Sequence, residues 1–243
     1  RRIRKGRLLI YVRSLLFVAL FYVWSVIFAL AITPLLLAPG EWMLRSLHVW
    51  NWGIKLLLRV VCGIRVEVRG HENLPKGGAL IAAKHQCMYD VFSQYGPLQH
   101  PIFVMKKELA WIPFLAWYAI KMGSIIVDRD GHSGALRKMV ADAKDRFRRN
   151  RQLVIFPEGT RGEPGVPGDY KPGIAALYRE LDLPVHPVAT NSGMHWPRHG
   201  FLRRPGVIVF EYLEPIPPGL KRAEFMRTLQ QRIDPASDAL NGL

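Results

Sequence analysis

The sequence predicts an α/β fold: a mixed, largely parallel sheet flanked by helices, with an N-terminal membrane-associated helical hairpin. Two observations predict this architecture. From about residue 63 onward, short apolar runs alternate with segments of helical periodicity, which is typical of layered α/β folds. Before that point lies an uncharged segment that is long enough to enter a bilayer. We therefore expect membrane-associated helices at residues 1–62 and an α/β domain at residues 63–243.

The composition is that of a folded protein with an anionic partner. Hydrophobic residues make up 49% and charged residues 22% of the 243 residues, whereas disordered chains have few apolar residues. A chain of this length holds one sizeable domain and an appendage. The formal net charge of +15 favours a nucleic acid, an anionic membrane or a phosphorylated substrate, and charge alone does not choose among them. The two cysteines provide neither a disulfide framework nor a zinc site, and we interpret them as reduced thiols.

The N-terminal segment has the length and polarity of a membrane helix. Between Leu15 and Leu37 the only polar interruptions are Ser25 and Thr33, and a bilayer span needs about 20 apolar residues. A secretory signal peptide has a shorter apolar core, although the Ala-Leu-Ala sequence at residues 29–31 does resemble a cleavage site. Six basic residues precede the segment: Arg1, Arg2, Arg4, Lys5, Arg7 and Arg13.

Two membrane topologies are compatible with this segment. Positive residues stay cytoplasmic, so a single crossing would place the rest of the chain on the far side. The next segment, Glu41 to Cys62, is too polar to cross easily because it contains Arg45, Lys55 and Arg59. We favour a hairpin that dips into the bilayer and returns through this second, interfacial helix, with the remainder facing the cytoplasm. Three tryptophans of the second segment suit the headgroup boundary: Trp42, Trp50 and Trp52.

Seven strands are predicted in the α/β domain. In the first, Ile64 to Val68, apolar and charged residues alternate as in a half-buried strand. The other six are short apolar runs, which suit strands buried on both faces: Ala79–Ala83, Ile102–Met105, Ser124–Val127, Leu153–Phe156, Val185–Ala189 and Val207–Tyr212. Helical periodicity marks five segments: Val91–Leu98, Phe114–Met122, Ser133–Phe147, Ile174–Glu180 and Arg222–Ile233.

His85 and Asp90 follow the predicted strand that ends at Ala83. Catalytic groups of α/β sheets gather beyond the carboxyl ends of strands. An imidazole can take a proton from an alcohol near neutral pH, and a carboxylate partner fixes its tautomer. Five positions apart on one ideal helix, the two side chains would diverge by about 140°, so the pair requires His85 on a loop and Asp90 at a helix start. A structural histidine explains the same spacing, and Cys87 raises the alternative of a cysteine nucleophile.

A second group of candidate residues lies in the hexapeptide Phe156 to Arg161. Gly159 permits a tight turn that exposes backbone N–H groups, and Arg161 can bind phosphate through two hydrogen bonds. Glu158 can orient a ligand hydroxyl or hold the arginine. A plain turn with an exposed arginine is the alternative interpretation.

Three weaker signals lie at other predicted strands. Lys106 follows the predicted strand Ile102–Met105 and can hold phosphate. Arg129 ends the segment that contains the predicted strand Ser124–Val127. Solvated charges, or a surface pair of Asp128 with Arg129, explain these residues equally well. Pro187 lies in a late strand beside His186 and indicates little alone.

Taken in order, these blocks resemble the glycerolipid acyltransferase family, and most closely its bacterial 1-acylglycerol-3-phosphate acyltransferases. The resemblance covers roughly residues 64–232 and the membrane-attached N-terminus. Its four blocks are His85…Asp90, Gly123…Arg129, Phe156…Arg161 and Val185–Val188, and their joint occurrence is far more specific than any one of them. Three positions depart from the common family pattern, in which asparagine or serine is usual: Lys84, Cys87 and Gly162.

The resemblance implies one-step acyl transfer, without an acyl-enzyme, from acyl-CoA or acyl-carrier protein to the sn-2 hydroxyl of lysophosphatidic acid, giving phosphatidic acid. It makes His85 the general base and Asp90 the residue that orients it. It implies no metal, no cofactor beyond the acyl donor as co-substrate, and a location at the bacterial inner membrane with the catalytic domain facing the cytoplasm. Acceptor-binding roles fall on seven residues: Lys106, Arg129, Glu158, Gly159, Thr160, Arg161 and Pro187.

Two other functions stay open at this point. The same fold can serve another acceptor, such as lyso-ornithine lipid, but the cluster of Lys106, Arg129 and Arg161 favours a phosphomonoester with two negative charges. The charge of +15 also suits a membrane-bound basic scaffold or a nucleic-acid binder, although the sequence has no recognisable nucleic-acid module. We therefore expect lysophosphatidic acid, an acyl donor and an anionic membrane as partners, and no nucleic acid.

Overall fold

The computed structural model describes residues 2–128 and 132–242 and is built around a seven-stranded sheet. The strands are β1 (Ile64–Arg69), β2 (Ala79–Ala83), β3 (Pro101–Lys106), β4 (Ile125–Val127), β5 (Gln152–Ile155), β6 (Val185–Thr190) and β7 (Gly206–Tyr212). Their order across the sheet is β1-β7-β6-β2-β5-β3-β4. The block from β6 to β4 is parallel, β7 is antiparallel to β6, and β1 is parallel to β7. The sheet is therefore mixed and largely parallel, as the sequence predicts.

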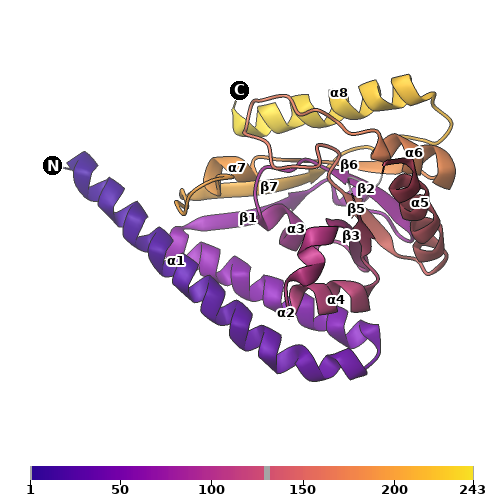
Figure 1. The fold of residues 1–243 in the computed structure, drawn as a ribbon. Coiled ribbons are helices and arrows are strands. Elements are labelled where there is room, and N and C mark those ends of the chain that lie inside the picture. The colour runs from indigo at the N-terminus through magenta and orange to yellow at the C-terminus, as the bar shows by residue number, and fades with distance from the viewer. Residues whose placement is uncertain (1, 129–131, 243) are drawn as a thin grey trace.

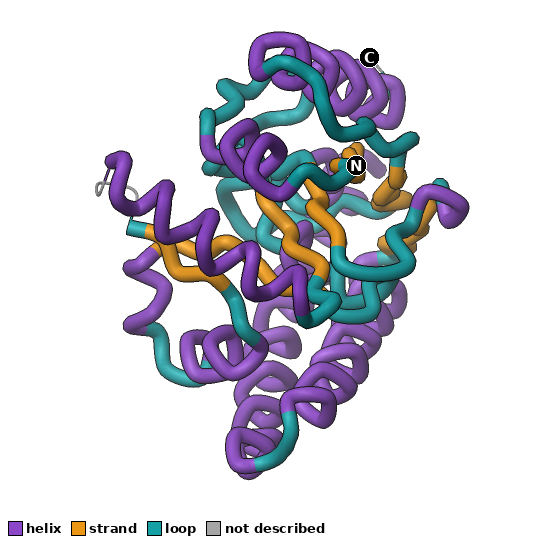
Figure 2. The backbone as a smooth tube through the Cα atoms, turned by 90° about the vertical axis from the view of Figure 1, so that its right-hand side faces the viewer, coloured by secondary structure: helices purple, strands orange, loops and turns teal. Residues whose placement is uncertain are grey.

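Helices cover both faces of this sheet (Figure 1 and Figure 2). They are α1 (Arg2–Ile32), α2 (Gly40–Leu57), α3 (Tyr89–Ser93), α4 (Leu115–Met122), α5 (His132–Arg148), α6 (Gly173–Leu181), α7 (Ser192–His195) and α8 (Arg222–Asn241). One face packs against α5, α6 and α8, and the opposite face packs against α1 to α4. The result is a three-layer α/β architecture.

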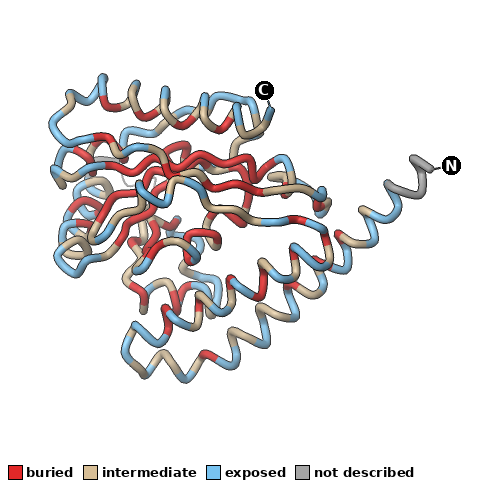
Figure 3. The backbone as a smooth tube through the Cα atoms, turned by 180° about the vertical axis from the view of Figure 1, so that it is seen from behind, coloured by how far each residue is buried: buried red, intermediate tan, exposed pale blue. Residues whose placement is uncertain are grey.

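Alternation along β2 explains why the sheet is buried on both faces. Ala79, Ile81 and Ala83 belong to the core shared with α1 to α4, whereas Leu80 and Ala82 belong to the core shared with α5, α6 and α8. Figure 3 shows the strands as the buried centre of the molecule, while much of α1 is exposed. Because both faces of the central strands are covered, their sequences are continuously apolar rather than alternating.

All seven predicted strands are confirmed, each within one residue at either end. Two predicted helices differ in extent. The helix predicted at Val91–Leu98 begins earlier and ends at Ser93, since Gly96 and Pro97 stop further helix. The helix predicted to end at Ile233 continues through Pro235 to Asn241. A proline inside a helix removes one hydrogen bond, and burial of the side chains on one face of α8 offsets this loss.

The chain begins with the predicted helical hairpin. A 3₁₀ helix at Thr33–Leu37 joins α1 to α2. The two helices pack antiparallel: Trp24 Nε1 donates a hydrogen bond to the Trp50 carbonyl (3.1 Å), and Arg13 Nε donates to the Val61 carbonyl (2.6 Å). These contacts join the first helix to α2 and to the helical turn that follows it, so the two helices do form a hairpin, whose position in a bilayer stays a prediction.

The three tryptophans of the predicted interface differ in exposure. Trp42 and Trp52 are 58% and 63% exposed, as expected for side chains at a headgroup boundary. Trp50, in contrast, turns inward. Its Nε1 donates to Ser25 Oγ (3.2 Å), and its ring packs edge-on against Phe92 with 4.7 Å between centroids. The indole N–H of the half-buried Trp50 therefore finds its partner on α1.

By length and composition, Arg7–Leu37 is the one helical stretch among the described residues that could cross a membrane. The hairpin nevertheless shares its core with the sheet, since Phe17, Ile54 and Ile64 belong to one buried cluster. The N-terminal helical region ends at Cys62 and β1 begins at Ile64, close to the expected domain boundary between residues 62 and 63. The division of the chain into two domains stays a prediction.

Gly53 provides a test of the hairpin packing. A Cβ atom at this position would lie 2.6 Å from the Trp24 ring, so Gly53→Leu cannot keep α2 against α1. We expect the free energy of unfolding in detergent to fall by about 1–3 kcal/mol, the usual cost of overpacking. Gly134→Leu is the matched control, because a Cβ at Gly134 meets no atom within 4 Å. Equal stability of the two variants would show that the helices do not pack in this way.

Candidate active site

The candidate site lies at the edge of the sheet where the parallel strands end. His85 follows β2 on a loop, and Asp90 is in the first turn of α3. The pair therefore meets the geometric requirement of its spacing. The carboxylate of Asp90 turns back toward the loop, where the amides of Gln86 and Cys87 precede the helix and lack a helical partner.

Asp90 is the centre of the hydrogen bonding at this site, and its side chain is fully buried (0% exposed). Its Oδ2 accepts from His85 Nδ1 (3.0 Å) and from the backbone N–H groups of Gln86 (2.6 Å) and Cys87 (2.7 Å). Its Oδ1 accepts from Ser192 Oγ (2.5 Å) and from Cys87 Sγ (3.4 Å). This many donors satisfy an ionised carboxylate that has no contact with water.

The contact with Asp90 determines the tautomer of His85. A carboxylate surrounded by donors acts as an acceptor, so Nδ1 of His85 carries the hydrogen and Nε2 keeps its lone pair. Within the described part of the chain, no hydrogen bond engages Nε2. The ring stacks on Phe156 with 4.2 Å between centroids, and its side chain is 15% exposed. The arrangement suits a base that accepts a proton at Nε2.

Cys87 lacks the environment of a reactive thiol. Its side chain is buried, and burial together with the adjacent Asp90 carboxylate raises the pKa of the Cys87 thiol well above its usual value. The thiol therefore stays protonated near neutral pH, and a protonated thiol is a poor nucleophile. The structure favours a packing and hydrogen-bonding role for Cys87.

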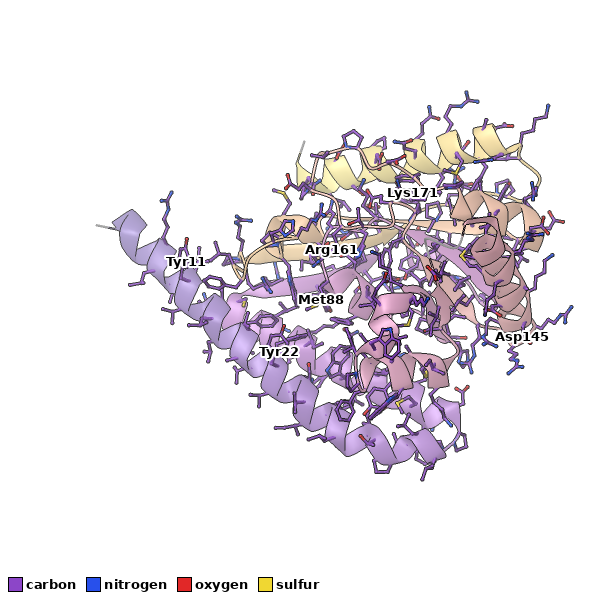
Figure 4. The ribbon with its side chains drawn as sticks, in the orientation of Figure 1. Tyr11, Tyr22, Met88, Asp145, Arg161 and Lys171 are labelled. Carbon is purple, nitrogen blue, oxygen red and sulfur yellow. The ribbon has the colours of Figure 1, made fainter. Side chains whose placement is uncertain are left out.

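The hexapeptide Phe156 to Arg161 forms a turn directly after β5, the neighbour of β2. Gly159 has φ +68° and its N–H donates to the Phe156 carbonyl (2.9 Å), so a residue with a side chain would be strained there. Thr160 is exposed and Arg161 is half-buried. No ion pair or hydrogen bond joins Arg161 to another described residue, which leaves its guanidinium available to a ligand. In Figure 4, Arg161 lies near the middle of the molecule.

Glu158 points from this turn into the protein. Its side chain is 3% exposed, its Oε2 accepts from the His85 backbone N–H (3.0 Å), and its Oε1 lies 2.7 Å from Lys84 Nζ. The following loop packs closely over the carboxylate, since a Cβ at Gly168 would lie 2.2 Å from Glu158 Oε1. Both carboxylate oxygens are therefore engaged by the protein itself.

The remaining predicted residues are less closely associated with His85. Lys106 is exposed at the end of β3, on the same edge of the sheet but two strands away from β2. Pro187 is buried in β6, level with Ala82 of β2. Arg129 lies outside the described residues. Among the described residues, no group of three or more His, Cys, Asp or Glu could hold a metal ion.

Sequence reasoning missed Ser192 and Gln86, which hold the site from opposite sides. Ser192 bonds Asp90, and the Gln86 Oε1 accepts from the Gly193 backbone N–H (2.9 Å). The signal that could have found Ser192 is the order of the strands in the sheet. Ser192 follows β6, and β6 is the parallel neighbour of β2, so polar residues after these two strands meet at one edge.

Comparison with known proteins identifies related sequences. Residues 65–191, slightly more than half of the chain, match the sequence model of the family described as Acyltransferase. A 1-acyl-sn-glycerol-3-phosphate acyltransferase of Pseudomonas aeruginosa is 38% identical over 152 residues, which are 63% of this chain and 59% of that protein. One of Saccharomyces cerevisiae is 29% identical over 168 residues, which are 66% of this chain and 54% of that protein. The match therefore spans less than two thirds of either relative.

A solved structure shares the fold. The crystal structure of the 1-acyl-sn-glycerophosphate (LPA) acyltransferase from Thermotoga maritima matches with a TM-score of 0.78 at 20% sequence identity. The match covers 96% of this chain and 99% of the other. The N-terminal hairpin and the mixed sheet are thus parts of one known architecture.

The Ser192 hydroxyl provides a test of how Asp90 is held. Ser192→Ala leaves a buried carboxylate oxygen without its strongest donor, and hydrogen bonds to charged groups contribute about 1.5–3 kcal/mol. We expect the free energy of unfolding to fall by that amount in a chemical denaturation at neutral pH. Ser93→Ala is the matched control, because the buried Ser93 hydroxyl donates to the Asp90 backbone carbonyl instead (2.9 Å). A larger loss from Ser93→Ala would contradict the assignment.

Proposed function

Because the chain belongs to the acyltransferase family, we propose that it is a 1-acylglycerol-3-phosphate O-acyltransferase. It transfers an acyl group from acyl-CoA or acyl-carrier protein to the sn-2 hydroxyl of lysophosphatidic acid and forms phosphatidic acid. The named relatives support this acceptor, although the match covers only part of their length. The observation that carries the proposal is the His85–Asp90 pair, with Nδ1 on the carboxylate and Nε2 unoccupied.

His85 acts as a general base in this mechanism. Nε2 takes the proton of the sn-2 hydroxyl while the hydroxyl oxygen attacks the thioester carbonyl. The tetrahedral intermediate then expels the thiolate, which takes the proton back from the imidazolium. Asp90 keeps the ring in the required tautomer and stabilises the imidazolium as it forms. No covalent acyl-enzyme is needed, in agreement with the buried, protonated thiol of Cys87.

Arg161 is the principal phosphate ligand of this proposal. It directly follows the turn at Gly159 and Thr160, and a guanidinium can bind a phosphomonoester through two hydrogen bonds. Lys106 adds positive charge at the same edge of the sheet, and Pro187 shapes the wall near β2. Arg129, which lies outside the described residues, keeps the phosphate-binding role that the family resemblance implies. The family resemblance also makes Glu158 an acceptor-binding residue. Its carboxylate, however, contacts Lys84 and the His85 backbone N–H inside the protein.

An exposed apolar surface supports membrane contact. It begins on α1 and continues onto α4, since the Tyr118 hydroxyl donates to the Ala29 carbonyl (2.5 Å). Monomeric soluble proteins rarely expose contiguous apolar patches of more than a few hundred Å². Six large apolar side chains are exposed on α4 and the segment before it: Leu109, Trp111, Ile112, Leu115, Trp117 and Ile120. The net charge of +15 favours anionic lipid as the partner of this surface and leaves no need to invoke nucleic acid.

The hairpin contacts favour insertion from one side of the membrane. The Ser14 hydroxyl accepts from the Arg203 backbone N–H (2.8 Å), and the Ala29 carbonyl accepts from the Tyr118 hydroxyl, so α1 is bonded to the body at two points along its length. A single crossing by α1 would break these bonds. A hairpin keeps the basic N-terminus and the α/β body on the same side, which the positive-inside rule makes the cytoplasm. We therefore place the catalytic domain on the cytoplasmic face of the bacterial inner membrane.

His85→Ala tests the mechanism. We expect kcat for lysophosphatidic acid to fall by about 10²–10⁴-fold, the usual contribution of general-base catalysis, while lipid binding is retained. The measurement is a detergent-based assay with acyl-CoA and acyl-carrier protein as donors. His199→Ala is the control, because His199 is an exposed histidine on a loop. Full turnover by His85→Ala would remove the proposed base and revive the scaffold alternative.

Arg161→Ala tests the acceptor. Loss of a charged hydrogen-bonded partner should raise KM for lysophosphatidic acid about 10- to 100-fold and change kcat little. The same variant should affect lyso-ornithine lipid much less, since that acceptor lacks a phosphomonoester. Arg179→Ala is the control, because Arg179 is exposed on α6 and pairs with Glu180 (3.0 Å). If the wild-type enzyme preferred lyso-ornithine lipid, the acceptor assignment would be wrong.

A further inference from the structure

A buried cluster of charges lies behind the loop that carries His85. Lys84 Nζ is 2.7 Å from Glu158 Oε1 and 2.8 Å from Asp234 Oδ1. The side chains of Lys84 and Glu158 are only 4% and 3% exposed, and that of Asp234 is 16% exposed. The Tyr170 hydroxyl also donates to Asp234 Oδ1 (3.0 Å). The cluster thus joins the residue after β2, the turn after β5, the following loop and the C-terminal helix α8.

The cluster reaches the catalytic loop through Glu158. Its second oxygen, Oε2, accepts from the His85 backbone N–H (3.0 Å). On the other side of the same residue, the His85 carbonyl accepts from the Gly162 backbone N–H (2.7 Å). The main chain of His85 is therefore held at both its amide and its carbonyl by the turn that contains Glu158.

The charges in the cluster depend on one another. Burial alone would lower the pKa of Lys84, but hydrogen bonds to Asp234 and Glu158 and their negative charges outweigh it and raise the pKa. Burial, followed by the charges of Asp234 and Glu158, raises the pKa of Tyr170 as well, so its hydroxyl stays a donor. Removing one member of a buried ion pair leaves its partner without compensation. A change at Asp234 should therefore alter the ion pair of Lys84 with Glu158.

We propose that Lys84, Glu158 and Asp234 are positioning residues, which hold the backbone of His85 so that its imidazole meets the acceptor hydroxyl. This inference rests on the proposed function. Asp234 on α8 holds the ammonium of Lys84, Lys84 holds the carboxylate of Glu158, and Glu158 holds the His85 amide. None of the three side chains contacts the reacting atoms. The C-terminal helix is in this way a part of the acyltransferase site, although it lies 150 residues from Lys84 in the sequence.

Asp234→Asn tests the proposal in the full-length protein in detergent. The substitution keeps the shape of the side chain and removes its charge. We expect kcat to fall about 10- to 100-fold, because a small displacement of a catalytic group has this effect, whereas KM for the acceptor should stay nearly constant. Asp234→Glu should restore much of the rate. Asp238→Asn, one turn further along α8 and without an ion pair among the described residues, is the matched control and should keep full activity.

A double-substitution cycle shows whether the residues act as one unit. Lys84→Met should lower kcat strongly, and Asp234→Asn should add little in the Lys84→Met background, because the chain of contacts is already broken. Thermal unfolding of each variant reports whether it is folded. If Asp234→Asn does not fold, Tyr170→Phe removes only one donor to Asp234 and should lower kcat by a smaller factor at unchanged KM.

Two results would overturn the inference. The first is a kcat of folded Asp234→Asn that equals the kcat of Asp238→Asn. If Asp234→Asn does not fold, an equal kcat of Tyr170→Phe and Asp238→Asn has the same meaning. The other is a loss from Asp234→Asn that is equally large with and without Lys84→Met. Rates are measured with whichever lysolipid the wild-type enzyme accepts, so failure with lysophosphatidic acid alone contradicts the proposed acceptor and not this role. A wild-type protein without acyltransferase activity on any lysolipid would overturn both.

Discussion

The organisation of the site depends on the burial of one carboxylate. Asp90 lies beneath the carboxyl ends of the strands with no exposure to solvent, and an ionised group in such a place needs donors on every side. Three of its donors come from Gln86 and Cys87 in the preceding loop, one from the imidazole of His85, and one from Ser192 beyond a neighbouring strand. Satisfying Asp90 therefore folds the loop after β2 and brings α3 and α7 together. It also leaves His85 with one nitrogen bound and the other free to accept a proton.

A second buried charge performs the same task one layer further from the His85 ring. The Glu158 side chain is nearly completely buried, and its two oxygens take the ammonium of Lys84 and the amide of His85. The loop around Gly168 fits over this carboxylate because that position has no side chain. Each buried charge thus determines the course of a loop, and together they give the histidine a fixed main chain and a fixed ring. Pre-organisation of this kind is what acid–base catalysis requires of a protein.

The apolar surface of the hairpin follows from a different constraint. Many apolar side chains on the outer side of α1 are exposed, whereas its inner side and that of α2 belong to the core shared with the sheet. The contacts of Arg13 with Val61 and of Tyr118 with Ala29 make the hairpin and α4 one continuous support. The apolar surface is therefore bonded to the same body that carries His85.

The sequence by itself determined the fold class, all seven strands, the hairpin and the local pairing of His85 with Asp90, because each depends on hydrophobic periodicity or on residues close together in the chain. It also indicated the glycine turn before Arg161, where φ is positive. Only the tertiary structure decided which distant residues complete the site. Ser192 and Asp234 become neighbours of the loop that carries His85 through the order of the strands and the packing of α8, and nothing in their local sequence marks them. Buried charges need partners from whichever segment packs nearby, and strand order determines which segment that is.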